Sequence, residues 1–395
     1  MKKKIKIGLF MDSFFPMVDG VIMVMDNYAR RLIKWADVIV FVPEYAGTKY
    51  DDSVFPYKVV RCKSVKAPII DYSMPIPKLD RKFIRELEGY QLDIVHIHSP
   101  FMMGKLGIKY AKKHHIPVVG TMHSQFKQDF RRATRVEEFA TILTKQVIKV
   151  FNACDECWAV NQEVARIFYE EYGYKKMPRV MNNATGMLPV PDVEKACQLI
   201  NEKHDIQKED KVFLFVGRIN QLKNIFLIAD SLKKLKEMAP ELPFKMLYVG
   251  NGQDEEALKK HLKENKMEDY VVMCGRVMDR ELLAAYYARA DLFLFPSLYD
   301  ASSIVQIEAA SQKTPCVFVE GAATAATVTA EVNGFISKND ATEYAKDILR
   351  IMKDEKLYKT VSENAYRDLY KNWDDTVKEV YERYRELIRE KEDSN

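Results

Sequence analysis

Residues 212–224 read Val-Phe-Leu-Phe-Val-Gly-Arg-Ile-Asn-Gln-Leu-Lys-Asn and open the second half of the chain. The first five residues are all apolar, which is typical of a strand in a parallel sheet that is covered on both faces. Gly217 can adopt turn conformations that other residues avoid, and the turn leads into a helix. The stretch therefore predicts a buried strand, a tight turn and a helix, which together begin a βαβ unit.

Comparable apolar runs recur on both sides of this stretch, with longer helical stretches between them. They lie at residues 5–10, 38–42, 59–61, 94–97, 118–121 and 156–160, and again at 212–216, 245–249, 270–274, 292–295 and 316–319. Turn and breaker residues at 182–191 separate the two series. The sequence predicts an α/β fold class: two doubly wound, Rossmann-like domains that face each other across a cleft.

The domain boundaries follow from this pattern. Residues 1–185 are predicted to form the first domain and residues 186–372 the second. Residues 373–395 are predicted to form a helix that returns to the first domain. Its apolar stripe, which includes Val377 and Tyr384, would pack there.

Composition excludes several classes of protein. The chain has 395 residues, and 61 Lys and Arg against 57 Asp and Glu give a formal net charge of +4, so no nucleic-acid partner is predicted. The six cysteines are scattered, and Lys6 and Asp12 interrupt the apolar run near the N-terminus. We therefore expect reduced thiols, no signal peptide and a cytoplasmic protein. No window approaches the ~20 apolar residues of a membrane-spanning helix.

Two cations follow the strand at 212–216. Ligands of open parallel sheets bind beyond the carboxyl ends of the strands, and Arg218 and Lys223 lie on the turn that enters the next helix. There the guanidinium and the ammonium could converge on a diphosphate. The alternative, two solvated surface cations, stays open at this point.

A second polar loop follows the predicted strand at 292–295. Asp300 lies in this loop, and Glu308 lies inside a helix that begins near Ser303. Free N–H groups at the helix start favour an anion, and the two carboxylates can accept hydrogen bonds from sugar hydroxyls. The alternative is that Asp300 caps the helix and Glu308 is solvated.

In the first half, Gly20 follows the first predicted strand and precedes a helical pattern. A glycine at such a turn lets backbone N–H groups approach a phosphate or a sugar, although the turn alone could require it. No G-x-G-x-x-G pattern occurs, which removes the usual support for a dinucleotide-dependent oxidoreductase.

These residues together resemble a known family. Gly217-Arg-x4-Lys223, followed about eighty residues later by Pro296-Ser-x2-acid-x7-Glu-Ala309, is similar to the donor half of GT-B-fold retaining glycosyltransferases of family 4 (group 1), which use nucleotide sugars. Further matching segments lie at residues 15–21, 96–101, 121–124, 249–252, 275–277, 288–291 and 333–335. The resemblance covers nearly the whole chain, and the segments around 98–101 and 123–132 look most like members that glucosylate diacylglycerol.

The resemblance implies roles for the matching residues. Arg218 and Lys223 would neutralise the diphosphate leaving group, and Glu308 would hold the ribose hydroxyls. Gly20 and His123 would approach the donor from the first domain. The implied catalytic residues are Arg218, Lys223, Asp300 and His123, and the implied donor-binding residues are Gly20, Gly217, Arg276, Val277, Ser303, Ile304, Val305 and Glu308.

Two positions depart from the family pattern. Asp300 replaces the usual glutamate, and Ser303 replaces a residue that is usually glycine. The loop at 321–327 also lacks the glycines that are common there. These departures keep open a second hypothesis, a catalytically weak or inactive relative that binds a nucleotide sugar or a glycan. A third hypothesis is a sugar-nucleotide epimerase of similar architecture.

No metal ion is predicted. His96 and His98 share one face of a predicted strand and His123 follows the next strand, but ordinary strand-end histidines are the favoured interpretation. Cys154 and Cys157 lack the second pair of a structural zinc site. The two cations described above and the helix N–H groups supply positive charge instead. The predicted co-substrate is a nucleoside diphosphate sugar, with no further cofactor.

The segment at 126–151 places cations beside an apolar stripe of helical spacing. A solvated basic face over a core stripe is one interpretation, and a docking face for an anionic membrane surface is the other. The predicted function is that of a retaining hexosyltransferase, with a UDP-sugar as the favoured donor. The predicted acceptor is a hydroxyl of diacylglycerol or of another membrane glycolipid or glycan. The predicted location is the cytoplasm, with peripheral attachment to the inner face of the plasma membrane as an option.

Overall fold

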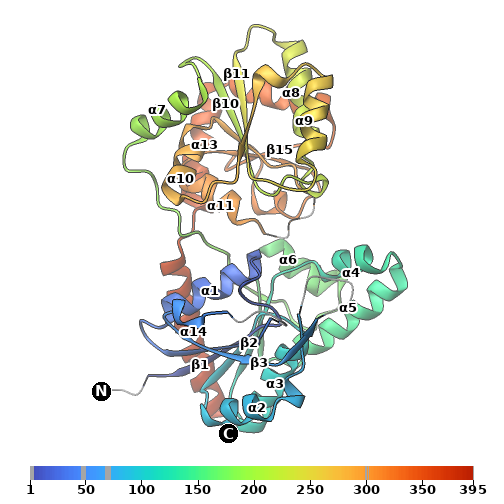
Figure 1. Ribbon diagram of the computed structural model, residues 1–395, viewed down its shortest axis with the longest axis vertical. Helices are drawn as coiled ribbons and strands as arrows, with labels where there is room; N and C mark the ends of the chain where they lie inside the picture. The colour runs from blue at the N-terminus through green and yellow to red at the C-terminus, as the bar shows by residue number, and fades with distance from the viewer. Residues whose placement is uncertain (1–3, 46–49, 67–72, 299, 301, 395) are drawn as a thin grey trace. The chain divides into compact units, whose positions relative to one another are not determined.

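The computed structural model describes residues 4–45, 50–66, 73–298, 300 and 302–394. The chain forms two compact units (Figure 1). The first unit consists of residues 1–183 and 373–395, and the second consists of residues 184–372. The boundary predicted from the sequence lies between residues 185 and 186.

The first unit is built on a seven-stranded sheet whose neighbouring strands are all parallel. Its strands, in spatial order, are β3 (Lys58–Cys62), β2 (Asp37–Pro43), β1 (Lys6–Phe10), β6 (Ile94–Ile97), β7 (Val118–Met122), β8 (Glu156–Ala159) and β9 (Arg179–Val180). β4 (Ser64–Lys66) and β5 (Ser73–Pro75) form a separate antiparallel pair. The strand order reverses between β1 and β6, which is where doubly wound sheets place their ligands.

Helices cover the sheet of the first unit (Figure 1). They are α1 (Gly20–Leu32), α2 (Arg81–Gly89), α3 (Met102–His114), α4 (Phe126–Thr134), α5 (Glu137–Phe151), α6 (Gln162–Arg166) and α14 (Trp373–Asp393). Short 3-10 turns span Asp52–Val54 (η1) and Pro77–Leu79 (η2), and a π turn spans Ile167–Glu171 (η3).

The second unit is built on a six-stranded sheet, again with parallel neighbours throughout. In spatial order its strands are β12 (Val271–Gly275), β11 (Phe244–Val249), β10 (Lys211–Val216), β13 (Leu292–Leu294), β14 (Cys316–Val319) and β15 (Phe335–Ser337). The apolar run at 212–215 is completely buried, because helices pack on both faces of β10. Here the strand order reverses between β10 and β13.

The second unit also has helices on both faces of its sheet (Figure 1). They are α7 (Val193–His204), α8 (Ile225–Met238), α9 (Glu255–Glu264), α10 (Arg280–Arg289), α11 (Ile304–Ser311), α12 (Ala341–Lys353) and α13 (Glu355–Leu369). Three 3-10 turns span Gln221–Lys223 (η4), Glu268–Tyr270 (η5) and Ala325–Thr327 (η6). Both units are therefore doubly wound α/β domains, as the sequence predicted.

The C-terminal helix α14 packs within the first unit through buried aromatic side chains. The Tyr384 ring stacks on Trp158 of β8 at a centroid distance of 5.5 Å, and the Trp373 ring meets the edge of Tyr28 of α1 at 5.9 Å. Val377 and Val380 on the same stripe are fully buried. Among the residues that the structure describes, no helix combines enough length with enough apolar character to cross a membrane.

Candidate active site

In the second unit, the loops after β10, β11 and β12 are joined at the carboxyl edge of the sheet. The Gly217 N–H donates to the Val249 carbonyl at 3.0 Å, and the Gly250 N–H donates to the Gly275 carbonyl at 2.8 Å. A Cβ atom on Gly250 would lie 1.9 Å from the Gly217 oxygen, and its φ of +140° also favours glycine. The loops at this edge therefore approach each other so closely that Gly250 has no room for a side chain.

Lys223 lies at this edge, at the end of η4, and its ammonium forms an ion pair with Asp300. The Nζ atom is 2.6 Å from both carboxylate oxygens, and each of the two side chains is 17% exposed. The ammonium also lies 5.8 Å from the centre of the Phe295 ring. The structure thus brings together two of the predicted catalytic residues from the loops on either side of the strand-order reversal.

Asp300 does not act as the helix cap that was the alternative interpretation. α11 begins at Ile304 with Ser303 as its N-cap, and the Ser303 side chain makes no capping hydrogen bond. Both oxygens of Asp300 accept from Lys223 instead. Ser303, Ile304 and Val305 are half-buried at the start of the helix.

Glu308 is a buried carboxylate with two partners from α10. It is 4% exposed, so the alternative of a solvated helix residue is wrong. Arg280 Nη2 donates to Oε1 at 2.6 Å, and the Tyr287 hydroxyl donates to Oε2 at 3.1 Å. Burial, and after it the Glu308 carboxylate, raise the pKa of the Tyr287 phenol, so it remains a hydrogen-bond donor at neutral pH. Sequence reasoning missed both partners.

Arg218, Arg276 and Val277 take no part in these two ion pairs. Arg218 is exposed, and within the described part of the chain its guanidinium forms no ion pair. Arg276 is also exposed, whereas Val277 packs half-buried against the core. Lys223 and Arg218 lie on the same loop, but of these two only Lys223 has a carboxylate partner among the described residues. Arg218 is therefore a cation at this edge that is open to an anionic ligand.

In the first unit, Gly20 is the first residue of α1. The Asp19 side chain caps the helix by accepting from the Ile22 N–H. A Cβ atom on Gly20 would meet nothing within 4 Å, and Gly20 does not have a positive φ. The backbone therefore does not require glycine at this position, so the turn alone does not explain Gly20.

Three histidines form a layer at the carboxyl ends of β6 and β7. The His96 and His98 rings lie 4.1 Å apart, and His98 Nδ1 lies 3.1 Å from His123 Nε2, so one imidazole donates to the other. His96 also contacts the Tyr384 hydroxyl and Thr121. His98 Nε2 is buried and has no hydrogen-bond partner among the described residues.

Burial keeps these imidazoles neutral. It lowers the pKa values of His96 and His98 well below the ordinary value, and it lowers the pKa of His123 to about 3. At neutral pH His123 can therefore donate or accept a hydrogen bond, but it does not supply a proton as an acid. Within the described residues, no group of three or more His, Cys, Asp or Glu is arranged to hold a metal ion, and all six cysteines are free.

Asp12, which is half-buried, is another group near this layer that sequence reasoning missed. Its carboxylate accepts from the Ser99 hydroxyl and, at 2.9 Å, from the Met103 N–H at the start of α3. Burial raises the pKa of Asp12, and these hydrogen bonds partly oppose that rise. The only sequence signal was its position directly after the first strand.

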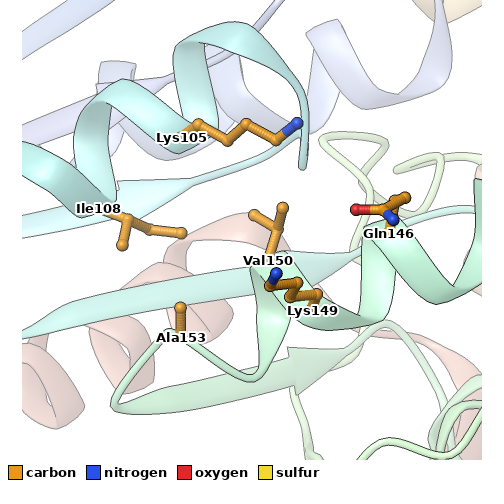
Figure 2. A pocket seen from close by; sticks show the side chains of 6 residues that line it. All are labelled: Lys105, Ile108, Gln146, Lys149, Val150 and Ala153. Atoms are coloured by element: carbon orange, nitrogen blue, oxygen red, sulfur yellow. The ribbon is translucent and has the colours of Figure 1, made fainter.

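A separate pocket lies between α3 and α5 of the first unit (Figure 2). Its volume is about 330 Å³, and Lys105, Ile108, Gln146, Lys149, Val150 and Ala153 line it. The segment predicted as a docking face also carries exposed apolar side chains. Phe139 and Ile142 of α5 are 60% and 54% exposed.

Comparison with known proteins finds two family models that match the chain. A model described as Glycosyltransferase Family 4 matches residues 18–184, and a model described as Glycosyl transferases group 1 matches residues 198–368. The first match lies almost entirely in the first unit, and the second lies in the second unit.

Two similar proteins are named alpha-monoglucosyldiacylglycerol synthase. The one from Acholeplasma laidlawii is 26% identical over 381 residues, which is 91% of each chain. The one from Streptococcus pneumoniae is 26% identical over 329 residues, which is 79% of this chain and 70% of the relative.

Solved structures share the fold at lower sequence identity. HepE from Anabaena, in complex with UDP and glucose, has a TM-score of 0.71 at 15% identity, and the match covers 96% of this chain and 99% of HepE. A sucrose-phosphate synthase from Thermosynechococcus elongatus has a TM-score of 0.74 at 18% identity, over 98% of this chain and all of that one.

Proposed function

The chain belongs to the GT-B-fold glycosyltransferases of family 4 (group 1), and from this premise we propose that it moves a hexose from a UDP-sugar to a hydroxyl of diacylglycerol. The family membership makes it a sugar-transferring enzyme. The finer points, which are the donor nucleotide, the acceptor and the stereochemical course, are the proposal. Glucose is the hexose we favour, because two similar proteins are named as glucosyldiacylglycerol synthases.

The observation that carries the proposal is the Lys223 ammonium at the carboxyl edge of β10. It lies where the strand order reverses, on the same loop as the exposed Arg218 guanidinium. In open α/β sheets this is the position that binds nucleotide ligands. UDP is the favoured nucleotide because HepE, which shares the fold, was solved with UDP.

In the proposed reaction, the bond between the sugar C1 atom and the leaving phosphate oxygen breaks, and a bond from C1 to the acceptor oxygen forms on the same face of the sugar. The acceptor proton passes to the leaving phosphate. Lys223 and Arg218 would stabilise the negative charge that develops on the diphosphate. The Asp300 carboxylate holds the Lys223 ammonium in place, so little reorganisation is needed during the reaction.

Diacylglycerol resides in a membrane, so we propose that the enzyme works peripherally on the inner face of the plasma membrane. The exposed Phe139 and Ile142, with the cations of α4 and α5, support docking on an anionic surface. The test is incubation of the protein with diacylglycerol vesicles and UDP-, GDP- or ADP-glucose. We expect UDP release and a new glycolipid from UDP-glucose, with the α-anomeric proton coupling in its NMR spectrum. Binding of UDP without release from any donor would instead favour a non-catalytic nucleotide-sugar binding protein.

Glu308→Gln is expected to weaken UDP binding through the ribose. The carboxylate is proposed to accept the ribose hydroxyls, and hydrogen bonds to a charged group contribute about 1.5–3 kcal/mol, so we expect a loss of affinity of about tenfold or more. Arg280, whose side chain is 55% exposed, remains solvated when its partner becomes neutral, so the fold should tolerate the change. Isothermal titration calorimetry with UDP measures the effect.

The matched ligand for this test is 2′,3′-dideoxy-UDP, which lacks both hydroxyls. Its affinity should be the same for the parent protein and for Glu308→Gln. The control variant is Glu363→Gln, which removes an exposed carboxylate that pairs with Lys313. An equal loss of affinity for UDP and for the dideoxy ligand would contradict the assignment of the ribose to Glu308.

A further inference from the structure

The pocket between α3 and α5 is apolar at its base and cationic at its rim. Ile108 and Val150 are each 7% exposed, whereas Lys105 and Lys149 are exposed. Figure 2 shows Ile108 and Val150 extending into the space between the two helices, with Lys105 on one helix and Lys149 on the other. The pocket therefore offers a cation from each side and an apolar floor.

Within the described parts of the chain, the two lysines lack acidic partners. On the same helices and their neighbours, Lys113 pairs with Glu88 and Lys127 pairs with Glu137. Among the residues that the structure describes, neither Lys105 nor Lys149 is within ion-pair distance of a carboxylate. Two uncompensated ammonium groups on opposite sides of one pocket favour an anionic occupant.

An exposed apolar stripe leads along α5 to this pocket. Phe139, Ile142 and Leu143 are 60%, 54% and 37% exposed, although large apolar side chains usually avoid water. Val150 continues the stripe at helical spacing, and it lines the pocket together with the polar Gln146. The surface thus presents an apolar track that ends at a pair of cations, which matches a molecule with apolar tails and an anionic head.

We propose that this pocket binds the phosphate headgroup of an anionic phospholipid while the α5 stripe enters the acyl region of the bilayer. The residues that line this pocket include none of those proposed for sugar transfer. The proposal deepens the proposed function and rests on it in one respect, since both place the enzyme on a bilayer. The pocket of about 330 Å³ has room for a phosphoglycerol group.

The test measures binding of the protein to vesicles by sedimentation in ~0.1 M salt. One set of vesicles is made of phosphatidylcholine with about 30% phosphatidylglycerol, and the other is pure phosphatidylcholine. We expect the double variant Lys105→Ala, Lys149→Ala to bind the anionic vesicles about 20- to 30-fold more weakly, because each cation near an anionic surface contributes about fivefold. The matched control is Lys109→Ala, Lys145→Ala, which removes the same charge from the same two helices outside the pocket. In this control, we expect the logarithm of the affinity for anionic vesicles to fall less than half as far as in the Lys105→Ala, Lys149→Ala variant.

Equal losses in the two double variants would overturn the pocket and indicate a diffuse electrostatic attraction. Competition by millimolar glycerol 3-phosphate would also overturn it, because the pocket would then take a soluble phosphate. Phe139→Ser should weaken binding to both kinds of vesicle, since it removes an apolar contact and no charge. Thermal melting checks that each variant folds.

A separate assay tests the proposed function. It measures glucose transfer to dioctanoylglycerol in detergent micelles. If the headgroup site is right, both lysine double variants should keep the parent rate there. Absence of transfer by every protein, with selective vesicle binding intact, would reject the sugar-transfer proposal and leave the headgroup site standing.

Discussion

Lys223→Ala is expected to lower kcat/KM for sugar transfer by about 10²- to 10³-fold, which is the usual effect of removing one preorganised group that stabilises developing charge. The variant removes one of the two cations proposed to face the diphosphate. It also leaves Asp300 without its ion-pair partner, so a carboxylate at the same edge of the sheet would repel the leaving group. The initial rate of UDP release in the presence of diacylglycerol vesicles measures the effect.

Two further variants show whether the loss comes from the position of the charge. Lys234→Ala removes a half-exposed lysine of α8 that pairs with Glu237, and it should leave the rate within a factor of two. Asp300→Asn keeps the Lys223 ammonium but weakens the ion pair that positions it, so we expect a smaller loss of kcat/KM than in Lys223→Ala. A Lys223→Ala protein that transfers sugar within threefold of the parent rate would remove this residue from the mechanism.

Lowering the pH from 7 to 5 is expected to destabilise the first unit by about 6 kcal/mol, because three histidines with lowered pKa values resist protonation in the fold. Burial lowers the pKa values of His96 and His98 well below the ordinary value, and that of His123 to about 3. The unfolded chain therefore binds more protons below pH ~6.5, and each histidine contributes about 2 kcal/mol over this range. The stability is present above pH ~6.5 and is lost as the pH falls.

Urea unfolding followed by tryptophan fluorescence measures this effect selectively. Trp35, Trp158 and Trp373, the three tryptophans of the chain, all belong to the first unit. His123→Gln should remove about a third of the pH dependence, on the assumption that each histidine contributes equally. The exposed His115, in a left-handed backbone conformation, provides the control His115→Asn, which should leave the pH dependence unchanged.

Asp12 contributes to the same curve with the opposite sign. Burial raises its pKa, so the folded state binds this proton more readily than the unfolded chain does, and the group gains stability as the pH falls toward its pKa. Asp12 therefore offsets part of the stability that the histidines lose, mainly at the acidic end of the titration. A stability that stayed level between pH 7 and pH 5 would contradict the neutral state of the three imidazoles.

Local patterns were sufficient for much of this description. Every apolar run named in the sequence overlaps a strand, and the turn after residues 212–216 carries Lys223 to the sheet edge, because strand periodicity and glycine turns depend on neighbouring residues. The same logic placed Ser303 at the start of α11. The order of motifs along the chain was also enough to recognise the family.

The partners of the polar groups needed the folded chain, because the chain brings together residues that are distant in sequence. Lys223 meets Asp300 across 77 positions, Arg280 meets Glu308 across 28, and Tyr384 reaches His96 across 288. No local rule links such positions, since each contact depends on which strands are neighbours and on how the helices pack over them. Burial follows from the same packing, and it is burial that turned Glu308 from an apparently solvated helix residue into a held carboxylate and the histidines into neutral imidazoles.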